Sequence, residues 1–221
     1  MSEAYREILR RVRAAAAATT HGAALLAVSK TKPAAAIREL ALLGQHAFGE
    51  NYVQEALAKQ RELTDLDLEW HLIGPLQSNK CREVALHFDW LQSLDRGKLV
   101  AALNRFRPPG KPPLNVLIQV NIDAEDSKSG CAPQDVPQLA AQVAAAPGLR
   151  LRGLMAIPQP APDADARRRA FQRMRALFDA TKSTFTQMDT LSMGMSDDFE
   201  LAIAEGATLV RIGTALFGRR T

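Results

Sequence analysis

The sequence has few cysteines, and they are poorly placed for binding a metal. Cys81 and Cys131 lie far apart in the chain, with no CxxC pair and no histidine at the spacing of a zinc ligand. This arrangement excludes a zinc site built on the cysteines, and we expect no metal in the protein. Reduced thiols of this kind are typical of the cytoplasm, so we predict a cytoplasmic location.

The sequence also lacks a long hydrophobic run. No stretch approaches the length needed to cross a membrane, and the alanine run at 14–18 is too short for the core of a signal peptide. Glu3 and Glu7 also lie among the arginines that precede this run. We therefore expect a soluble protein that has no membrane partner.

Neither sign of charge dominates, and aromatic residues are scarce. Lysine and arginine total 28 against 24 aspartates and glutamates, and aromatic residues make up only 5% of the chain. The basic residues are spread over 6–13, 167–169 and 219–220, without the interleaved aromatics of a protein that binds single-stranded nucleic acid. We therefore predict no nucleic-acid partner.

The sequence does contain enough apolar residues for a large core. Hydrophobic residues make up 47% of the 221 positions. This length exceeds that of an average domain but suits a barrel formed by one domain. We predict a single domain over residues 1–221.

Short apolar runs alternate with helical patterns along the chain. We predict strands at 24–30, 47–50, 69–74, 88–95, 114–122, 151–157, 189–195 and 208–213. We predict helices between them at 33–44, 51–63, 78–88, 97–106, 135–146, 163–185 and 196–206. This alternation is typical of an α/β fold in which a parallel sheet closes into a single (β/α)8 TIM barrel. An open, doubly wound sheet is the alternative.

An extra helix is predicted before the first strand. Tyr5, Ile8 and Val12 recur at helical spacing, and Ser2 is a residue type that caps the starts of helices.

Candidate site residues follow the ends of the predicted strands. In a TIM barrel, functional groups come from the C-terminal ends of the strands and from the loops that follow them. The residues that we select from these positions are Lys30, Asn51, Met155, Ser192, Ser196, Arg211, Gly213 and Thr214.

The last two units of the barrel indicate a phosphate site. "SMGMSDD" places Ser192 and Ser196 before a predicted helix, and "RIGTALFG" places Gly213 and Thr214 before a short helical turn. These loops hold phosphate in TIM barrels, because hydroxyls and backbone N–H groups converge there at the N-terminus of a helix. Alternatively, Ser196 is only a helix cap and Gly213 only a tight turn.

Lys30 ends the first predicted strand, in "LLAVSKTKP", across the barrel mouth from the phosphate site. A neutral lysine amine attacks an aldehyde, and a phosphate site would anchor that aldehyde, so pyridoxal 5′-phosphate fits both ends as a Schiff base. Alternatively, Lys30 is a solvated lysine at a strand end. Lys32 precedes Pro33 and is expected to point into the loop, and Lys128 has no distinguishing context.

An ordered set of motifs resembles one family over nearly the whole chain. The motifs are "AVSKTKP", "FGENYVQE", "WHLIGPLQSNK", "NVLIQVNI", "DSKSG", "LRGLMAIP", "LSMGMSDD" and "VRIGTALFG". In this order they resemble the pyridoxal phosphate homeostasis proteins, which are relatives of the alanine racemase N-terminal barrel. The resemblance implies a protein that binds pyridoxal phosphate and maintains intracellular vitamin B6, without turning over a substrate.

The resemblance also implies roles for the candidate residues. Lys30 should carry the cofactor as an aldimine, Asn51 should lie beside the ring and its phenolic oxygen, and Met155 should lie near the ring. The residues implied around the phosphate are Ser192, Ser196, Gly213 and Thr214.

Arg211 should approach the pyridine nitrogen of the cofactor, again by resemblance. A guanidinium only donates hydrogen bonds, so it would hold this nitrogen unprotonated and make the ring a weaker electron sink. Alternatively, Arg211 forms a salt bridge to a carboxylate at the rim.

Two classes of function fit this site, a carrier and an amino-acid racemase. Racemases need acid–base groups on both faces of the substrate, and the resemblance implies that alanine racemases take a tyrosine from a second domain. The tyrosines here are Tyr5 and Tyr52, and the chain ends soon after the eighth unit. We therefore predict a carrier that has no catalytic residues, with a racemase as the alternative. The comparison with alanine racemases also predicts a monomer. Pyridoxal-phosphate-dependent apoenzymes are the candidate recipients of the carried cofactor. A third candidate is an aldolase that uses Lys30 on phosphosugars.

Three ring side chains have a structural interpretation beside the functional one. His71, in "WHLIG", is either a general base or a core residue with satisfied hydrogen bonds. Trp70 and Trp90 are expected to pack between the barrel and its helices.

Overall fold

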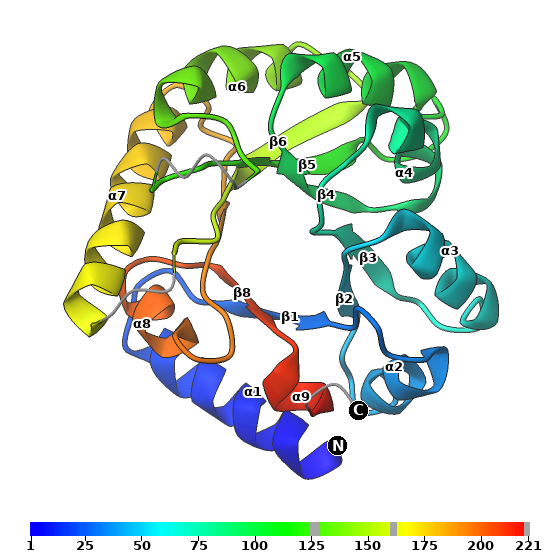
Figure 1. Ribbon diagram of the computed structural model, residues 1–221, viewed down its shortest axis with the longest axis vertical. Coiled ribbons are helices and arrows are strands. Elements are labelled where there is room, and N and C mark those ends of the chain that lie inside the picture. The colour runs from blue at the N-terminus through cyan, green and yellow to red at the C-terminus, as the bar shows by residue number, and fades with distance from the viewer. Residues whose placement is uncertain (124–128, 160–162, 219–221) are drawn as a thin grey trace.

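The strands close into a barrel. The computed structural model describes residues 1–123, 129–159 and 163–218. Eight parallel strands follow one another around the barrel in chain order, and β8 pairs with β1 to close it (Figure 1). The TIM barrel predicted from the alternation is confirmed, and the alternative of an open sheet is wrong.

The strands lie close to the predicted apolar runs. They are β1 Ala24–Val28, β2 Ala47–Glu50, β3 Glu69–Leu72, β4 Trp90–Leu94, β5 Leu114–Gln119, β6 Leu149–Met155, β7 Thr190–Ser192 and β8 Leu209–Ile212. Most end earlier than the sequence predicts, because the last residues of the apolar runs leave the sheet to form the barrel mouth. Lys30 and Asn121, for example, lie beyond the ends of β1 and β5.

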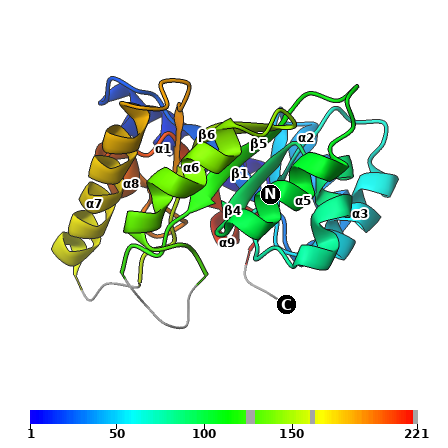
Figure 2. The same cartoon turned by 90° about the horizontal axis from the view of Figure 1, so that it is seen from above.

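Helical segments follow each strand and surround the barrel (Figure 2). The α-helices are α1 Ser2–Ala17, α2 Ala34–Ala41, α3 Val53–Glu62, α4 Cys81–His87, α5 Gly97–Phe106, α6 Val136–Ala144, α7 Ala164–Lys182, α8 Phe199–Ala204 and α9 Thr214–Phe217. Two short 3₁₀ turns, η1 Ser78–Lys80 and η2 Pro133–Asp135, precede α4 and α6. None of the helices within the described residues is long and apolar enough to cross a membrane.

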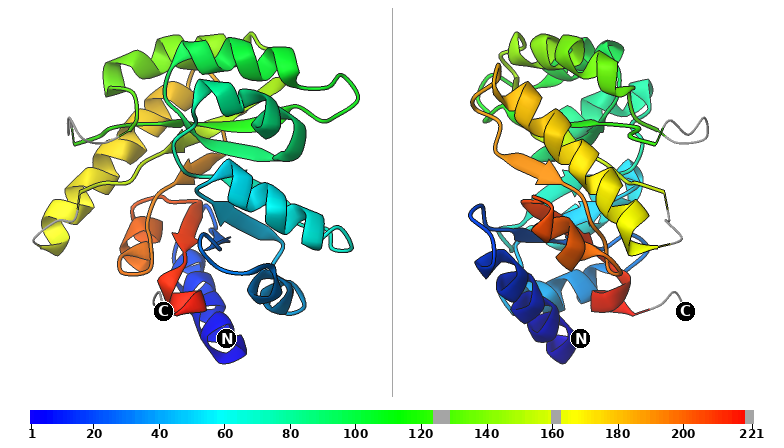
Figure 3. Two further views of the ribbon diagram at one scale, coloured as in Figure 1. Left: turned by 45° about the vertical axis from the view of Figure 1, so that its right-hand side comes forward. Right: turned by 90° about the vertical axis from the view of Figure 1, so that its left-hand side faces the viewer.

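The predicted extra helix is present as α1, which lies beside α8 and α9 (Figures 1 and 3). Its apolar face buries Tyr5, Ile8 and Val12, and Arg11 pairs with Glu200 of α8 at 2.6 Å. The prediction that Ser2 caps this helix is wrong. The helix already includes Ser2, so its side chain lies inside the first turn rather than before it.

Each strand directs alternate side chains to an outer and an inner core. The outer core lies between strands and helices and includes Trp70, as predicted. Trp90 instead belongs to a separate cluster with Leu117 and Met155 inside the barrel, so its predicted place between barrel and helices is wrong. The reason is register, since Trp90 pairs with His71, whose ring stacks on it at 5.0 Å between ring centroids.

Gly194, just after β7, allows α8 to approach the barrel closely. It has a φ of +92°, and a Cβ there would lie 2.5 Å from the Cβ of Ala202. Gly44 is a matched control, because its φ is +98° but a Cβ there would meet nothing within 4 Å. The two glycines therefore share the backbone requirement and differ in packing.

We expect Gly44→Ala to lower the free energy of unfolding by about 1–2 kcal/mol through backbone strain alone. Gly194→Ala should cost a further ~1–3 kcal/mol, because α8 must shift away from the barrel. Urea unfolding of both variants measures the difference. Equal losses would show that the contact between Gly194 and α8 does not limit the packing.

Candidate functional site

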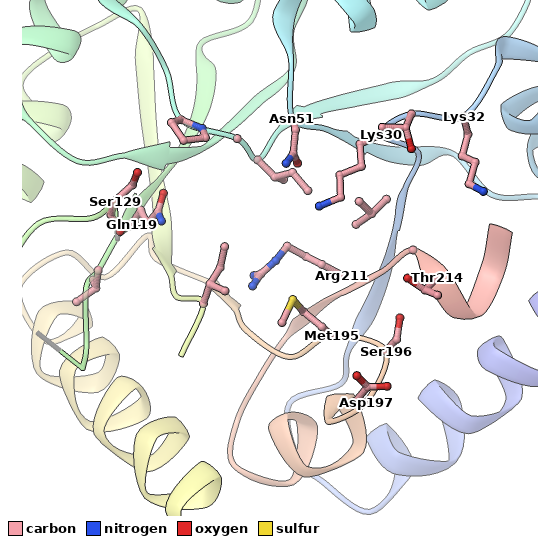
Figure 4. Close-up of a pocket in the computed structure, with 18 of the residues that line it drawn as sticks. Lys30, Lys32, Asn51, Gln119, Ser129, Met195, Ser196, Asp197, Arg211 and Thr214 are labelled. Atoms are coloured by element: carbon pink, nitrogen blue, oxygen red, sulfur yellow. Dashed lines mark hydrogen bonds between the residues drawn. The ribbon is translucent and has the colours of Figure 1, made fainter. Parts of the chain in front are cut away.

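A cavity of about 800 Å³ opens at the C-terminal ends of the strands. Several of the residues predicted for the site line it together, and Figure 4 shows most of them. These are Lys30, Asn51, Ser196, Arg211, Gly213 and Thr214. They come from the loops after β1, β2, β7 and β8 and from β8 itself, which the barrel brings to one mouth.

Met155 and Ser192 take a different position from the other candidates. They are register partners on β6 and β7, and both are fully buried inside the barrel rather than exposed to the cavity. Met155 packs with Trp90 and Leu117, and Ser192 forms a hydrogen bond to Arg211. Both therefore belong to the layer of side chains that supports the cavity residues.

Lys30 directs its amine into the cavity, towards Arg211 (Figure 4). Lys32, two residues later, points away from the centre of the cavity in the same view. Its Nζ donates to the carbonyl oxygens of Phe217 at 3.1 Å and Gly218 at 3.4 Å, in agreement with the expectation that it points into the loop. Lys128 lies outside the described residues.

A buried group of charges lies behind Lys30, and we call Ser29, Glu50, Glu55 and Lys59 the Lys59 cluster. Lys59 Nζ donates to the Ser29 carbonyl at 2.8 Å and to Oε1 of both Glu50 and Glu55 at 2.7 Å. The Ser29 hydroxyl also donates to Glu50 Oε1, at 2.5 Å. Three groups, from β2, α3 and the residue after β1, thus accept hydrogen bonds from one ammonium.

The Lys59 cluster holds the backbone on both sides of Lys30. Ser29 is held through its carbonyl and hydroxyl, and the N–H of Thr31 donates to Glu55 Oε1 at 2.5 Å. Thr31 has a φ of +64°, a left-handed conformation that a β-branched residue adopts only when its surroundings enforce it. The cluster therefore fixes the direction in which Lys30 leaves the strand.

The Lys59 cluster was not predicted from the sequence. Glu55 and Lys59 are four residues apart on a helix, which is the usual pattern of an exposed ion pair. Glu50, in "FGEN", gave no other signal than its place at a strand end. Only the packing of α3 on β1 and β2 buries Lys59 to 5% exposure and Glu50 to 0%.

Glu50 is under strain as an ionised group. Burial raises its pKa above the ordinary value, although hydrogen bonds from Lys59 and Ser29 act in the opposite direction. Its second oxygen, Oε2, is buried and has no hydrogen-bond partner among the described residues. The positive charge of Lys59 therefore offsets part of the free-energy cost of burying the Glu50 carboxylate.

Arg211 brings a charge to the floor of the cavity. Its Nη1 donates to Ser192 Oγ at 2.6 Å and its Nη2 to the Ala156 carbonyl at 2.8 Å. Both partners are neutral oxygens, and within the described part of the chain Arg211 has no salt bridge. Burial lowers the pKa of Arg211 to about 10, so it remains charged at neutral pH. A guanidinium has five N–H donors, so it retains donors for a ligand.

The opposite side of the cavity has the composition of an anion site. Ser196, on the loop after β7, and Thr214, the first residue of α9, lie close together in Figure 4. Ser196 is not a helix cap, because α8 begins at Phe199 and Asp198 precedes it. Among the described residues that line the cavity, the charged ones are Lys30, Lys32, Arg211 and Asp197, an excess of positive charge.

His71 is a core residue with satisfied hydrogen bonds, as one of its two interpretations predicted. It is 1% exposed, and its ring nitrogens contact Glu69 and Gln92. It does not line the cavity. A role as a general base acting directly on a ligand is therefore inconsistent with its position.

Comparison with known proteins places the chain in a family. Residues 3–221 match the family model described as the alanine racemase N-terminal domain. The chain is 56% identical over 223 residues to a pyridoxal phosphate homeostasis protein of Pseudomonas aeruginosa, and the match covers 100% of this chain and 96% of that protein. The chain belongs to the pyridoxal phosphate homeostasis protein family.

Solved structures agree with this assignment. PipY of Synechococcus elongatus, solved with pyridoxal phosphate bound, is 39% identical and superposes with a TM-score of 0.86, covering 98% of this chain and 99% of PipY. Alanine racemase of Corynebacterium glutamicum is only 20% identical, with a TM-score of 0.66, covering 96% of this chain and 61% of the racemase. The second likeness concerns the fold alone.

Substitution of Lys59 tests the Lys59 cluster in this member of the homeostasis family. We expect Lys59→Met to lower the free energy of unfolding by about 3–5 kcal/mol near pH 8, because it leaves the Glu50 carboxylate buried without a counterion. A carboxyl whose folded pKa is raised favours folding when protonated and loses this contribution as the pH rises through the folded pKa. The loss should therefore be smaller at pH 5 than at pH 8.

Denaturant unfolding at the two pH values measures this effect. In the double variant Glu50→Gln/Lys59→Met the uncompensated charge is absent, so most of the stability should return and the pH dependence should weaken. A loss in Lys59→Met that is independent of pH and unchanged by Glu50→Gln would contradict the assignment.

Proposed function

We propose that this protein binds pyridoxal 5′-phosphate in the cavity and maintains its intracellular supply, as a carrier that turns over no substrate. The observation that supports this most directly is the arrangement of one cavity. It combines an inward lysine amine at Lys30, a guanidinium at Arg211 and an anion site at Ser196 and Thr214. These groups match the aldehyde, the ring nitrogen and the phosphate of the cofactor.

Different residues of the cavity would hold different parts of the cofactor. Lys30 Nζ would bond to the aldehyde carbon as a Schiff base, with loss of one water molecule. Ser196, Gly213 and Thr214 would hold the phosphate through hydroxyl and backbone N–H groups. Asn51, on the loop after β2, lies on the same side as Lys30 in Figure 4 and would contact the ring.

Arg211 limits the chemistry that the bound cofactor can support. Pyridoxal phosphate acts as an electron sink for carbanions, most strongly when its ring nitrogen is protonated. Because Arg211 only donates hydrogen bonds, it would keep that nitrogen unprotonated. Met155 and Ser192 would support the ring from the layer below, Ser192 through its bond to Arg211.

The surroundings of the cavity favour a carrier over a racemase. A racemase needs acid–base groups on both faces of the substrate. The described residues that line the cavity include no tyrosine. Tyr52, next to Asn51, is 62% exposed, and Tyr5 is buried in α1.

We propose that the whole chain acts as one cofactor-binding domain, as a cytoplasmic monomer, and that pyridoxal-phosphate-dependent apoenzymes are its recipients. Cys81 and Cys131 are both free and buried, which suits a reducing compartment. Ile157 and Met195, at the cavity, are 38% and 40% exposed and would be accessible to a recipient. Sedimentation of the loaded protein tests the monomer.

Replacement of Lys30 tests the covalent site. The wild-type protein mixed with pyridoxal phosphate should gain a near-visible absorption band, and borohydride should fix a pyridoxyl group on Lys30. In Lys30→Ala the band and the fixed group should be absent, whereas Lys98→Ala, an exposed lysine of α5, should behave like the wild type. Absorption spectra and peptide mapping measure both. Labelling of other lysines at full yield in Lys30→Ala would contradict the assignment.

A chiral assay tests the absence of turnover. We expect the loaded protein to convert L-alanine to D-alanine at no more than the rate of free pyridoxal phosphate, because the described lining of the cavity includes no tyrosine as a second acid–base group. Efficient conversion that is lost in Lys30→Ala would support the racemase instead. Borohydride trapping of a phosphosugar on a protein that does not bind pyridoxal phosphate would indicate the aldolase.

A further inference from the structure

A continuous line of polar side chains crosses the interior of the barrel. We call Glu69, His71, Gln92, Ser192 and Arg211 the polar chain. The links are Glu69 Oε1 to His71 Nε2 at 2.8 Å, His71 Nδ1 to Gln92 Nε2 at 2.9 Å, Gln92 Oε1 to Ser192 Oγ at 2.7 Å and Ser192 Oγ to Arg211 Nη1 at 2.6 Å. It therefore connects the start of β3 with the cavity.

The two ends of the polar chain determine the direction of every hydrogen bond between them. Glu69 only accepts, so Nε2 of His71 carries the hydrogen and donates to the Glu69 carboxylate. Nδ1 of the neutral ring then accepts from Nε2 of the Gln92 amide, which turns Gln92 Oε1 towards Ser192. The Ser192 hydroxyl donates to Gln92 Oε1 and accepts from Arg211, which can only donate.

This direction requires a single form of His71, the neutral ring with its hydrogen on Nε2. A second hydrogen on Nδ1 would face the Gln92 amide hydrogens and break the chain. Burial lowers the pKa of His71, against the raising effect of Glu69, and so favours the neutral ring. The ring is also held in plane by Trp90, which stacks on it at 5.0 Å with an angle of 7°.

The polar chain is sealed from water over most of its length. His71, Gln92 and Ser192 are 1%, 0% and 0% exposed, and Arg211 is 4% exposed. Only the Glu69 side chain, at 47%, reaches solvent. Hydrogen bonds in such an interior resist rearrangement, because no water replaces a lost partner.

A purely structural role of the polar chain would account for its hydrogen-bonded core residues. It would not account for the charge of Arg211 at the cavity end of the polar chain. Arg211 carries its charge at the floor of the cavity without a salt bridge within the described residues. The polar chain instead links it through neutral groups to the Glu69 carboxylate. The guanidinium is therefore held in one place without neutralisation by a neighbouring carboxylate, which would compete with a ligand.

We propose that His71 and Gln92 are positioning residues for Arg211. Through Ser192 they fix the orientation of the guanidinium at the cavity, and Glu69 fixes the direction of the whole chain from the other end of the barrel. The inference rests on the proposed function, because it assigns these residues the task of presenting Arg211 to the ring nitrogen of pyridoxal phosphate.

The first experiment uses the protein without cofactor and is independent of the proposed function. Long-range ¹⁵N spectra of the histidine rings at pH 7, with His71 identified by the loss of its signals in His71→Gln, should show a neutral ring that carries its hydrogen on Nε2. Glu69→Ala, at a position where the side chain is 47% exposed, should produce a mixture of the two neutral forms. A charged ring, or a hydrogen on Nδ1 in the wild type, would overturn the proposal.

The second experiment measures the cofactor itself, with a matched control. Gln92→Met keeps the size of the side chain but removes the amide. Gln45→Met makes the same change at a buried glutamine, 5% exposed, whose amide bonds to the carbonyls of Leu25 and Ala47 outside the polar chain. Titration with pyridoxal phosphate should show affinity about tenfold weaker in Gln92→Met, with a shifted absorption band, because a bond that orients a charged donor is lost.

Gln45→Met should bind pyridoxal phosphate with an affinity within about twofold of that of the wild type and show an unshifted absorption band. We expect this even if its melting temperature falls as far as that of Gln92→Met. Equal affinities and spectra in the two variants, with a wild type that binds normally, would overturn the positioning role alone. A wild type that does not bind pyridoxal phosphate would overturn the proposed function, and the histidine spectra would still decide on the polar chain. If Gln92→Met does not fold, His71→Gln and Glu69→Ala provide the same titration.

Discussion

The pairing of β8 with β1 is the constraint on which the cavity depends. Its register sets Leu26 beside Arg211 and Ala27 beside Ile212. Lys30 follows β1 and Thr214 follows β8, so this pairing brings the amine and the anion site to the same mouth. In the same sheet left open, β1 and β8 would be opposite edges, and the two groups would be separated by its full width.

Closure also creates an interior that is not purely apolar. The outer face of the strands packs on helices with apolar side chains, as parallel strands usually do. Within the described residues, the inner face has a small apolar cluster around Trp90 together with a set of hydrogen-bonded polar groups. An interior of this kind can support a charged residue such as Arg211, because its partner Ser192 is in turn hydrogen-bonded to Gln92.

Two separate networks hold Lys30 and Arg211, two of the cations that line the cavity. The Lys59 cluster lies outside the barrel wall and fixes the backbone around Lys30 through buried charges. The polar chain lies inside and holds the Arg211 side chain through neutral groups. The Lys59 cluster fixes the backbone at the end of β1 and leaves the Lys30 side chain available for reaction. The polar chain fixes the Arg211 side chain, which only has to donate hydrogen bonds. This arrangement suits a carrier, because a carrier has to hold its ligand in place and does not need side chains that move protons.

The sequence by itself determined the order of strands and helices, the extra helix and the choice of Lys30 with the loops after β7 and β8. These are local signals, because hydrophobic periodicity, strand ends and glycine-rich turns act over a few residues. The tertiary structure alone decided that Trp90 points inward and that Ser192 supports Arg211. It also decided that Lys59 is buried. The physical reason is that the inward or outward direction of a side chain in a closed barrel depends on register with distant strands, which no local pattern contains.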